Sequence, residues 1–176
     1  MQDDDVPDDF LLRLPSSLIR IGVALRLEEA DDRAVVRALY AAARAGELAH
    51  VSWPPAMMAV FLDNQFAAQS AHYAANHPAA DRWIVTRHGV PVGRLYVDRS
   101  DTEWRLLDIV LACEARGLGI GGALVAAIVR AARSSRADVA LHVAHDNPRA
   151  AALYRRLGFI ETASGSATHQ AMRHPA

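Results

Sequence analysis

The chain has 176 residues, of which 52% are hydrophobic and 22% charged; this composition excludes intrinsic disorder and suits a single globular domain. Its 19 basic residues, all of them arginine, nearly balance 20 acidic ones, so a net charge of −1 gives no bulk reason to bind nucleic acid or an anionic membrane. One cysteine, Cys113, excludes an internal disulfide framework and a paired-cysteine metal or redox motif.

The first 17 residues are polar and rich in Asp and Pro, and we expect them to form a poorly ordered leader before one domain over residues 18–176. Their acidic character is the opposite of the basic start of a signal peptide. The longest apolar stretch, residues 118–129, is too short to span a bilayer. These features predict a cytoplasmic protein.

Hydrophobic periodicity and turn residues divide the rest of the chain into strands and helices. In the first part we expect a strand at 19–26, helices at 31–45 and 57–76, and strands at 82–87, 90–97 and 103–111. In the second part we expect a helix at 123–133, a strand at 139–143, a helix at 148–156, and short strands at 158–162 and 168–172. This order predicts an α/β fold with a mixed sheet of about seven strands and about four helices.

A glycine-rich segment between a strand and a helix, residues 116–122, is typical of a phosphate-binding loop, because glycines let the backbone approach an anion at a helix N-terminus. A tight structural turn is the alternative. Gly117-x-Gly119-x-x-Gly122 also fits a dinucleotide fingerprint, with Asp146 as the acidic residue. Five residues separate this fingerprint from its strand and only 54 follow it, and both facts count against a dinucleotide-binding oxidoreductase.

Two motifs of this sequence resemble those of the GNAT superfamily of acyl-CoA-dependent N-acetyltransferases. They are Arg116-x-x-Gly119-x-Gly121 and Asn147-x-x-Ala150-x-x-x-Tyr154-x-x-x-Gly158-Phe159. The resemblance covers residues 80–172 well and fades before them. It implies a GNAT-like domain whose central strands splay apart, with acetyl-CoA as co-substrate.

The resemblance also implies which residues bind CoA. They are Ile109, Val110, Leu111, Arg116, Gly117, Leu118, Gly119, Ile120, Gly121, Gly122, Asn147 and Tyr154. The loop would hold the phosphates, and residues 109–111 would pair with the pantetheine arm through their backbone. The N–H of Val110 is the expected donor to the thioester oxygen. Asn147 either caps its helix, or also contacts CoA.

Acetyl transfer needs a neutral amine, a donor for the developing negative charge and a proton for the departing thiolate. Tyr154 is the candidate acid, since its ordinary pKa of about 10 lies above that of a thiol, about 8.5. The alternative is that its ring only packs the helix.

The candidate bases are Glu103 and Asp108, which lie 13 and eight residues before Arg116. Regular alternation puts them on opposite faces of their strand, so both can face the acceptor only if a bulge lies between them. Glu103 is otherwise a solvated strand start, whereas Asp108 in an apolar strand needs a partner. A water chain is the third alternative.

We therefore predict an N-acetyltransferase whose acceptor is a small-molecule amine or a peptide or protein N-terminus, without nucleic acid or membrane as partner. A homodimer is compatible with the sequence. We expect no metal, because His142 and His145 point to different sides of a strand. The alternatives are a non-catalytic acyl-CoA-binding protein and, for the mechanism, an acyl-enzyme on Cys113.

Overall fold

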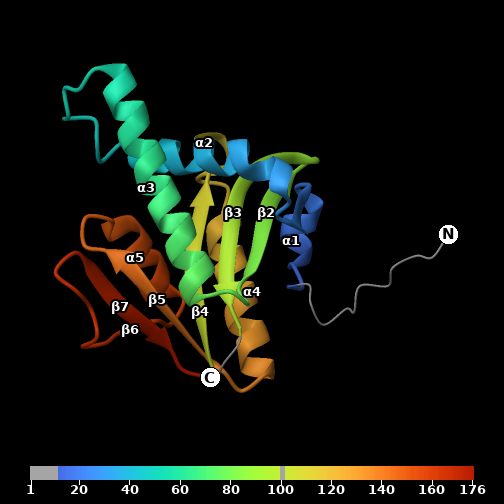
Figure 1. Ribbon diagram of the computed structural model, residues 1–176. Helices are drawn as coiled ribbons and strands as arrows, with labels where there is room; N and C mark the ends of the chain where they lie inside the picture. Colours follow the sequence, from blue (N-terminus) through green and yellow to red (C-terminus); the bar gives the residue numbers. More distant parts are fainter. Residues whose placement is uncertain (1–11, 100–101) are drawn as a thin grey trace.

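The computed structural model describes residues 12–99 and 102–176, and it consists of one seven-stranded sheet with helices on both faces (Figure 1). The strands are β1 (Val23–Leu27), β2 (Asp81–Arg87), β3 (Val90–Asp98), β4 (Glu103–Leu111), β5 (Asp138–Ala144), β6 (Ile160–Glu161) and β7 (His169–His174). The helices are α1 (Ser16–Arg20), α2 (Arg33–Arg44), α3 (Pro55–Asn76), α4 (Ile120–Ser134) and α5 (Pro148–Arg156), with 3₁₀ turns η1 (Ala30–Asp32) and η2 (Cys113–Ala115).

The spatial order of the strands is β1-β2-β3-β4-β5-β7-β6, and β4 and β5 form the parallel pair of an otherwise antiparallel sheet. The predicted mixed sheet of about seven strands is therefore confirmed. The helix count differs from the expected four, because α1 occupies residues that the sequence pattern assigned partly to the leader and partly to the first strand. Pro15, at the N-cap, is followed by this short helix, and β1 begins only at Val23.

The expected leader also differs in the part that the structure describes. Leu12 is buried and Leu14 packs against the main core, so residues 12–17 already belong to the packed domain. Residues 1–11 lie outside the described residues. Burial of Leu12 removes apolar surface from water, and such burial stabilises the folded chain by roughly 2 kcal/mol for a leucine.

The two faces of the sheet carry different chemistry. Under α4, the buried side chains are apolar, and Trp83, Leu95 and Leu124 are fully enclosed. Under α2 and α3 the apolar cluster is small: Val36, Tyr40, Phe66 and Ile84. The rest of that face carries polar side chains, among them a buried arginine, Arg94. A sheet face that buries polar groups beside a small apolar cluster is a candidate for a catalytic or binding site.

A β-bulge in β4 sets which of its side chains face α2 and α3. Tyr96 of β3 lies opposite Asp108, and Val97 lies opposite Leu106, so Leu107 is an extra residue with no partner in the register. A bulge shifts the alternation of side chains by one position. Glu103 and Asp108 therefore project from the same face, which is the condition under which both could face an acceptor.

Helix α3 is long but poorly covered. It extends beyond the body of the domain at its N-terminal end (Figure 1), and Phe66 is the one fully buried residue among its 22. A cavity of about 340 Å³ separates this end from α2, and an ion pair between Arg37 and Asp63 lies at its lining. No described helix, α3 included, has the length and apolar character needed to cross a membrane.

Candidate functional site

The centre of the sheet opens where β4 and β5 part. Their pairing runs from Glu103 opposite Asp138 to Leu106 opposite Leu141 and stops there, although both strands continue. Residues 109–111 keep β3 on one side and have no strand on the other. The predicted splay of the central strands is thus present, and it leaves a backbone edge that an extended ligand can pair with.

Alternation of the backbone determines which N–H groups face this opening. The N–H of Ala112 donates to Val92 O at 2.8 Å, which is on the β3 side. Every second residue points the same way, so Val110 also directs its N–H to β3, while Ile109 and Leu111 face the gap. This differs from the expectation for Val110: the residue is on the predicted edge, but the gap-facing donor is the N–H of Ile109.

The glycine loop forms an anion cradle at the end of this edge. Gly117 and Gly119 both have left-handed backbone (φ +78° and +77°), and a Cβ at either position would point into open space. The helix begins earlier than expected, so the N–H groups of residues 120–122 form the first turn of α4 and have no side-chain cap. Free N–H groups at a helix N-terminus favour a phosphate.

The other loop residues support this cradle. Arg116 Nε donates to Leu111 O at 2.8 Å, which ties the loop to the last residue of β4. Leu118 is exposed at the tip, whereas Ile120 is buried and anchors the helix in the core. Gly122 is close to Leu153 of α5, 3.3 Å from where a Cβ would lie, so a side chain there would crowd the neighbouring helix.

Tyr154 lies on α5, beside the gap. The helix is positioned by Asn147, whose side chain accepts a hydrogen bond from the N–H of Ala150 at 3.1 Å and so caps the helix as predicted. The Tyr154 ring packs against Phe159 with 5.7 Å between centroids. Among residues 12–99 and 102–176, its hydroxyl has no hydrogen-bond partner. Burial, and after it the nearby Asp108 carboxylate, raise the pKa of Tyr154 to about 12.

Asp108 forms an ion pair with Arg94 of β3, which lies diagonally from it on the α2 and α3 face, two residues before its register partner Tyr96. The Arg94 side chain is 2% exposed and also donates to Gln69 Oε1 at 2.8 Å. Its Nη2 contacts Asp108 Oδ2 without hydrogen-bond geometry, so this carboxylate oxygen has no hydrogen-bond donor in the described part of the chain. Burial raises the pKa of Asp108; Arg94 and the N–H of Ile109 oppose that rise.

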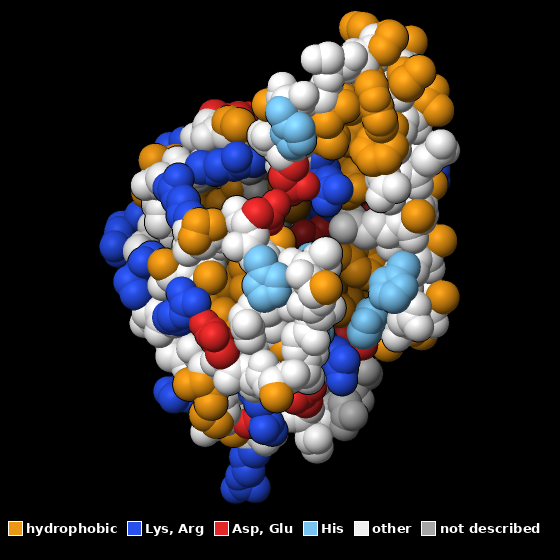
Figure 2. All heavy atoms as spheres, turned by 90° about the vertical axis from the view of Figure 1, so that its left-hand side faces the viewer, with side chains coloured by type: hydrophobic (Ala, Val, Ile, Leu, Met, Phe, Trp, Pro, Cys, Tyr) orange, Lys and Arg blue, Asp and Glu red, His pale blue; other side chains and the backbone are white. Residues whose placement is uncertain are grey.

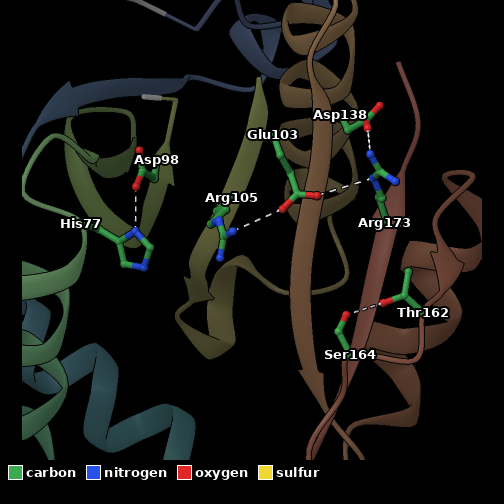
Figure 3. A network of polar contacts seen from close by, with 8 residues as sticks. All are labelled: His77, Asp98, Glu103, Arg105, Asp138, Thr162, Ser164 and Arg173. Atoms are coloured by element: carbon green, nitrogen blue, oxygen red, sulfur yellow. Dashed lines mark hydrogen bonds and ion pairs between the residues drawn. The ribbon is translucent and has the colours of Figure 1, made fainter. Parts of the chain in front are cut away.

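Glu103 is not brought together with Asp108 and Tyr154. It lies at the opposite end of β4, where its carboxylate contacts Arg105 at 3.4 Å and Arg173 at 3.5 Å (Figure 3). Five residues of β-strand separate it from Asp108, a distance of roughly 16 Å along the strand. Arg173 also pairs with Asp138, so Glu103 belongs to a polar network on the sheet, away from the gap (Figure 3).

Several polar residues near Asp108 were not predicted from the sequence as part of the site. Tyr73 of α3 donates to Leu107 O at 3.1 Å, which holds the helix over the bulge. Tyr96 of β3 donates to the Glu28 carboxylate, and its ring lies 5.3 Å from the Arg94 guanidinium. Burial raises the pKa of Tyr73 and of Tyr96. The signal that could have found Arg94 and Tyr96 is the run of polar residues on alternate positions of β3, which only a known register assigns to one face.

This arrangement combines an anion cradle, a free strand edge, a buried carboxylate and a buried phenol at one opening. The space-filling view of this side is hollowed near its centre, with acidic side chains beside the hollow and arginines to one side (Figure 2). Within the described residues, no group of three His, Cys, Asp or Glu side chains gathers as a metal site would require. Cys113 is exposed in η2.

Comparison with known proteins gives a consistent assignment. The chain matches the family model described as "Acetyltransferase (GNAT) family" over residues 33–159. A comparison with curated proteins found no match. Similar solved structures include PaiA N-acetyltransferase from Thermoplasma acidophilum in complex with coenzyme A, with a TM-score of 0.69, 11% identity, and coverage of 88% of this chain and 99% of that one.

Two more solved structures share the fold. Spermidine N-acetyltransferase from Vibrio cholerae, in complex with CoA and spermine, has a TM-score of 0.60 and 18% identity over 88% of this chain and 95% of that one. Ard1 from Thermoplasma volcanium has a TM-score of 0.58 and 22% identity over 89% of this chain and 99% of that one. At these identities the likeness concerns the fold.

Proposed function

The chain belongs to the GNAT acetyltransferase family, and from this premise we propose that it transfers an acetyl group from acetyl-CoA to a primary amine by direct attack of the amine on the thioester. The observation that carries the proposal is the meeting of four features where β4 and β5 part: the glycine cradle, the gap-facing N–H of Ile109, Asp108 and Tyr154.

The residues of the opening fit the co-substrate. The left-handed Gly117 and Gly119 and the uncapped start of α4 make a cradle for phosphate groups, with open space where side chains would otherwise stand. The unpaired edge at Ile109 and Leu111 suits the amide groups of the pantetheine arm. Bound acetyl-CoA supplies an activated acetyl thioester. The proposal includes no metal.

One backbone group and two side chains each have a separate role in the proposed acetyl transfer. The N–H of Ile109 exchanges its interaction with the Asp108 carboxylate for one with the thioester oxygen as negative charge develops there. The Asp108 carboxylate, which is paired with Arg94, accepts a proton from the attacking amine, directly or through a water. The Tyr154 hydroxyl, with a pKa of about 12, stays protonated and donates a hydrogen bond to the departing sulfur.

The magnitude of the Tyr154 pKa refines its role. A phenol of pKa about 12 is a weaker acid than a thiol of about 8.5, so complete proton transfer to the thiolate costs roughly 5 kcal/mol. A hydrogen bond that stabilises the thiolate needs no such transfer. We therefore assign Tyr154 as the donor that stabilises the leaving group, with the proton released by the amine available to complete the exchange.

Glu103 is a weaker candidate for the base. Its contacts with Arg105 and Arg173 engage its carboxylate at the far end of β4. Asp108 is favoured because it shares the opening with Tyr154, whose pKa responds to the Asp108 charge.

The experiment that tests the function combines binding and turnover. We expect acetyl-CoA to raise the melting temperature and NAD to leave it unchanged, because only the former fills both cradle and strand edge. Acetyl-CoA consumption is then measured against a panel of polyamines, amino acids and peptides with free N-termini. If NAD raises the melting temperature and acetyl-CoA does not, the proposed binding of acetyl-CoA is wrong. If acetyl-CoA binds but no amine is acetylated, a non-catalytic acyl-CoA-binding protein is favoured.

Direct attack is separated from an acyl-enzyme by Cys113→Ala. Cys113 is exposed in η2, next to the cradle, and its replacement leaves turnover within a few-fold of wild type if the amine attacks the thioester itself. Protein mass measured after incubation with acetyl-CoA alone gives the independent check. A gain of one acetyl group that the variant lacks would establish the two-step route.

A further inference from the structure

The exposed face of α3 carries an apolar pattern that its own chain does not use. Positions three and four residues apart form a strip that we call the outer stripe, and all of its members are exposed. The outer stripe consists of Met57, Val60, Asn64, Ala67, Ala71 and Ala74. Around the helix axis it lies away from Phe66, the buried residue of α3, and its last member, Ala74, also borders a cavity that Leu27 and Glu28 line. A 3-4 spacing of apolar residues is the pattern of a helix-pairing seam.

Two observations show that this face is costly when left in water. Met57 is 53% and Val60 60% exposed, and Trp53, just before the helix, is 44% exposed. Apolar side chains gather on the projecting part of the molecule in the space-filling view (Figure 2). The helix has one charged residue, Asp63, and that residue is paired with Arg37. Large apolar side chains exposed together on one part of a surface indicate a site of contact with a partner.

We propose that the outer stripe is a homodimer interface, in which α3 packs antiparallel against α3 of a second copy. The stripe is bulky at its N-terminal end and small at its C-terminal end. An antiparallel two-fold puts Met57 opposite Ala74 of the copy and Val60 opposite Ala71, so large side chains meet small ones in both halves. A parallel pair would place Met57 against Met57 and leave a gap between the alanines.

Asn64 favours a second copy of this chain over an unrelated apolar helix as the partner of the outer stripe. In the antiparallel arrangement it lies opposite Ala67 of the copy, so the two Asn64 side chains flank the two-fold axis. A carboxamide has both donor and acceptor groups, and two related copies can therefore satisfy each other across the axis. A single polar residue in such a seam also fixes register and partner number.

The area is sufficient for a specific but modest dimer. The stripe spans about 26 Å of helix. Two helices packed along that length bury on the order of 1,000 Å² in total, at the low end of specific interfaces. We therefore expect dissociation in the micromolar range, with the alanines allowing close approach of the helix axes.

The test is the oligomeric state, measured by light scattering and sedimentation over a concentration series from nanomolar to high micromolar. We expect a reversible monomer–dimer equilibrium that Val60→Glu weakens roughly a hundredfold or more, because the carboxylate loses its water in the seam. Val90→Glu is the matched control, since Val90 is 61% exposed in the β2–β3 hairpin, far from α3. A monomer throughout the series would overturn the proposal, as would equal weakening by both variants.

A charge pair tests the antiparallel register and guards against a folding defect of the single variant. Val60→Glu combined with Ala71→Lys places opposite charges against each other twice in the proposed dimer, and dimerisation should return. In a parallel dimer the double variant would place like charges together. Circular dichroism checks that each variant is folded. Failure of the double variant to recover, with the fold intact, would refute the antiparallel pairing.

Discussion

Replacing Asp108 by Asn separates the chemical role of this residue from its structural one. The variant keeps the shape of the side chain and removes its charge, so the Arg94 guanidinium remains buried with the Gln69 side-chain oxygen as its remaining acceptor among the described residues. Removing one partner of a buried ion pair costs about 3–5 kcal/mol. For a chain of this length, each kcal/mol lowers the melting temperature by about 2–4 °C. We therefore expect Asp108→Asn to melt roughly 10 °C lower than wild type.

The double variant Arg94→Met, Asp108→Leu tells the two effects apart. Exchange of a buried ion pair for apolar residues of similar volume is often neutral or stabilising, so we expect the double variant to recover most of the lost stability. It should not recover activity, because no carboxylate remains to accept the amine proton. Removal of a positioned base lowers the rate by about 10²–10⁴-fold.

Urea unfolding and the pH profile of kcat/KM are the two assays. A raised pKa means that Asp108 becomes ionised, and therefore a base, only above its ordinary range, so the rising limb of the wild-type profile should lie above pH 4. Both variants should lack this limb. Wild-type turnover in the double variant would refute the assignment of Asp108 as base. Unchanged stability of Asp108→Asn would refute the energetic account of the buried pair.

Three further changes test other parts of the site and fold. Tyr154→Phe keeps the ring and removes the donor, so kcat should fall by about 10²-fold while the KM for acetyl-CoA changes little; a loss confined to KM would mean that the hydroxyl only binds. Gly119→Ala should weaken CoA binding, measured by calorimetry, at least about tenfold, because φ is +77° and the added methyl group enters the cradle. Gly121→Ala is the control: its Cβ would lie 3.6 Å from the Leu111 side chain, an ordinary contact, so this variant should bind CoA nearly as wild type. Arg26 lowers the pKa of Asp32 to about 2, so this pair stabilises the fold above pH 4 and is lost as the pH falls toward 2; Asp32→Asn should cost about 1–2 kcal/mol at neutral pH, a gap that closes in acid.

The glycine loop and the capped helix could be predicted from sequence because their signals are local. The positive φ at Gly117 and Gly119 and the cap at Asn147 depend on residues within a few positions of one another. The splay followed from the family resemblance and not from hydrophobic pattern, since β4 and β5 both read as ordinary buried strands. The acceptor class, an amine on a small molecule or at a peptide or protein N-terminus, and the cytoplasmic location stay predictions.

The residues around Asp108 show what sequence reasoning lacks. A carboxylate in an apolar strand predicts a buried partner, but Arg94 belongs to a different strand, and only the β3–β4 register brings the two together. An arginine in β3 looks by itself like an exposed residue. The direction of the Val110 N–H was also beyond sequence, because it depends on which neighbouring strand Ala112 pairs with.

The bulge at Leu107 makes the chemistry of β4 sensitive to chain length as well as to residue identity. Deleting this one residue would restore regular pairing with β3 and leave Leu106 opposite Val97 and Asp108 opposite Tyr96, so both flanking segments would keep their faces. Regular pairing of all nine residues of β4 would instead turn Asp108 to the face of Trp104 and Leu106, in the apolar layer beneath α4 and away from Arg94. A carboxylate four residues after Trp104 therefore faces the opening only when a bulge lies between them, whereas a carboxylate three residues after Trp104 would face it in a regular strand.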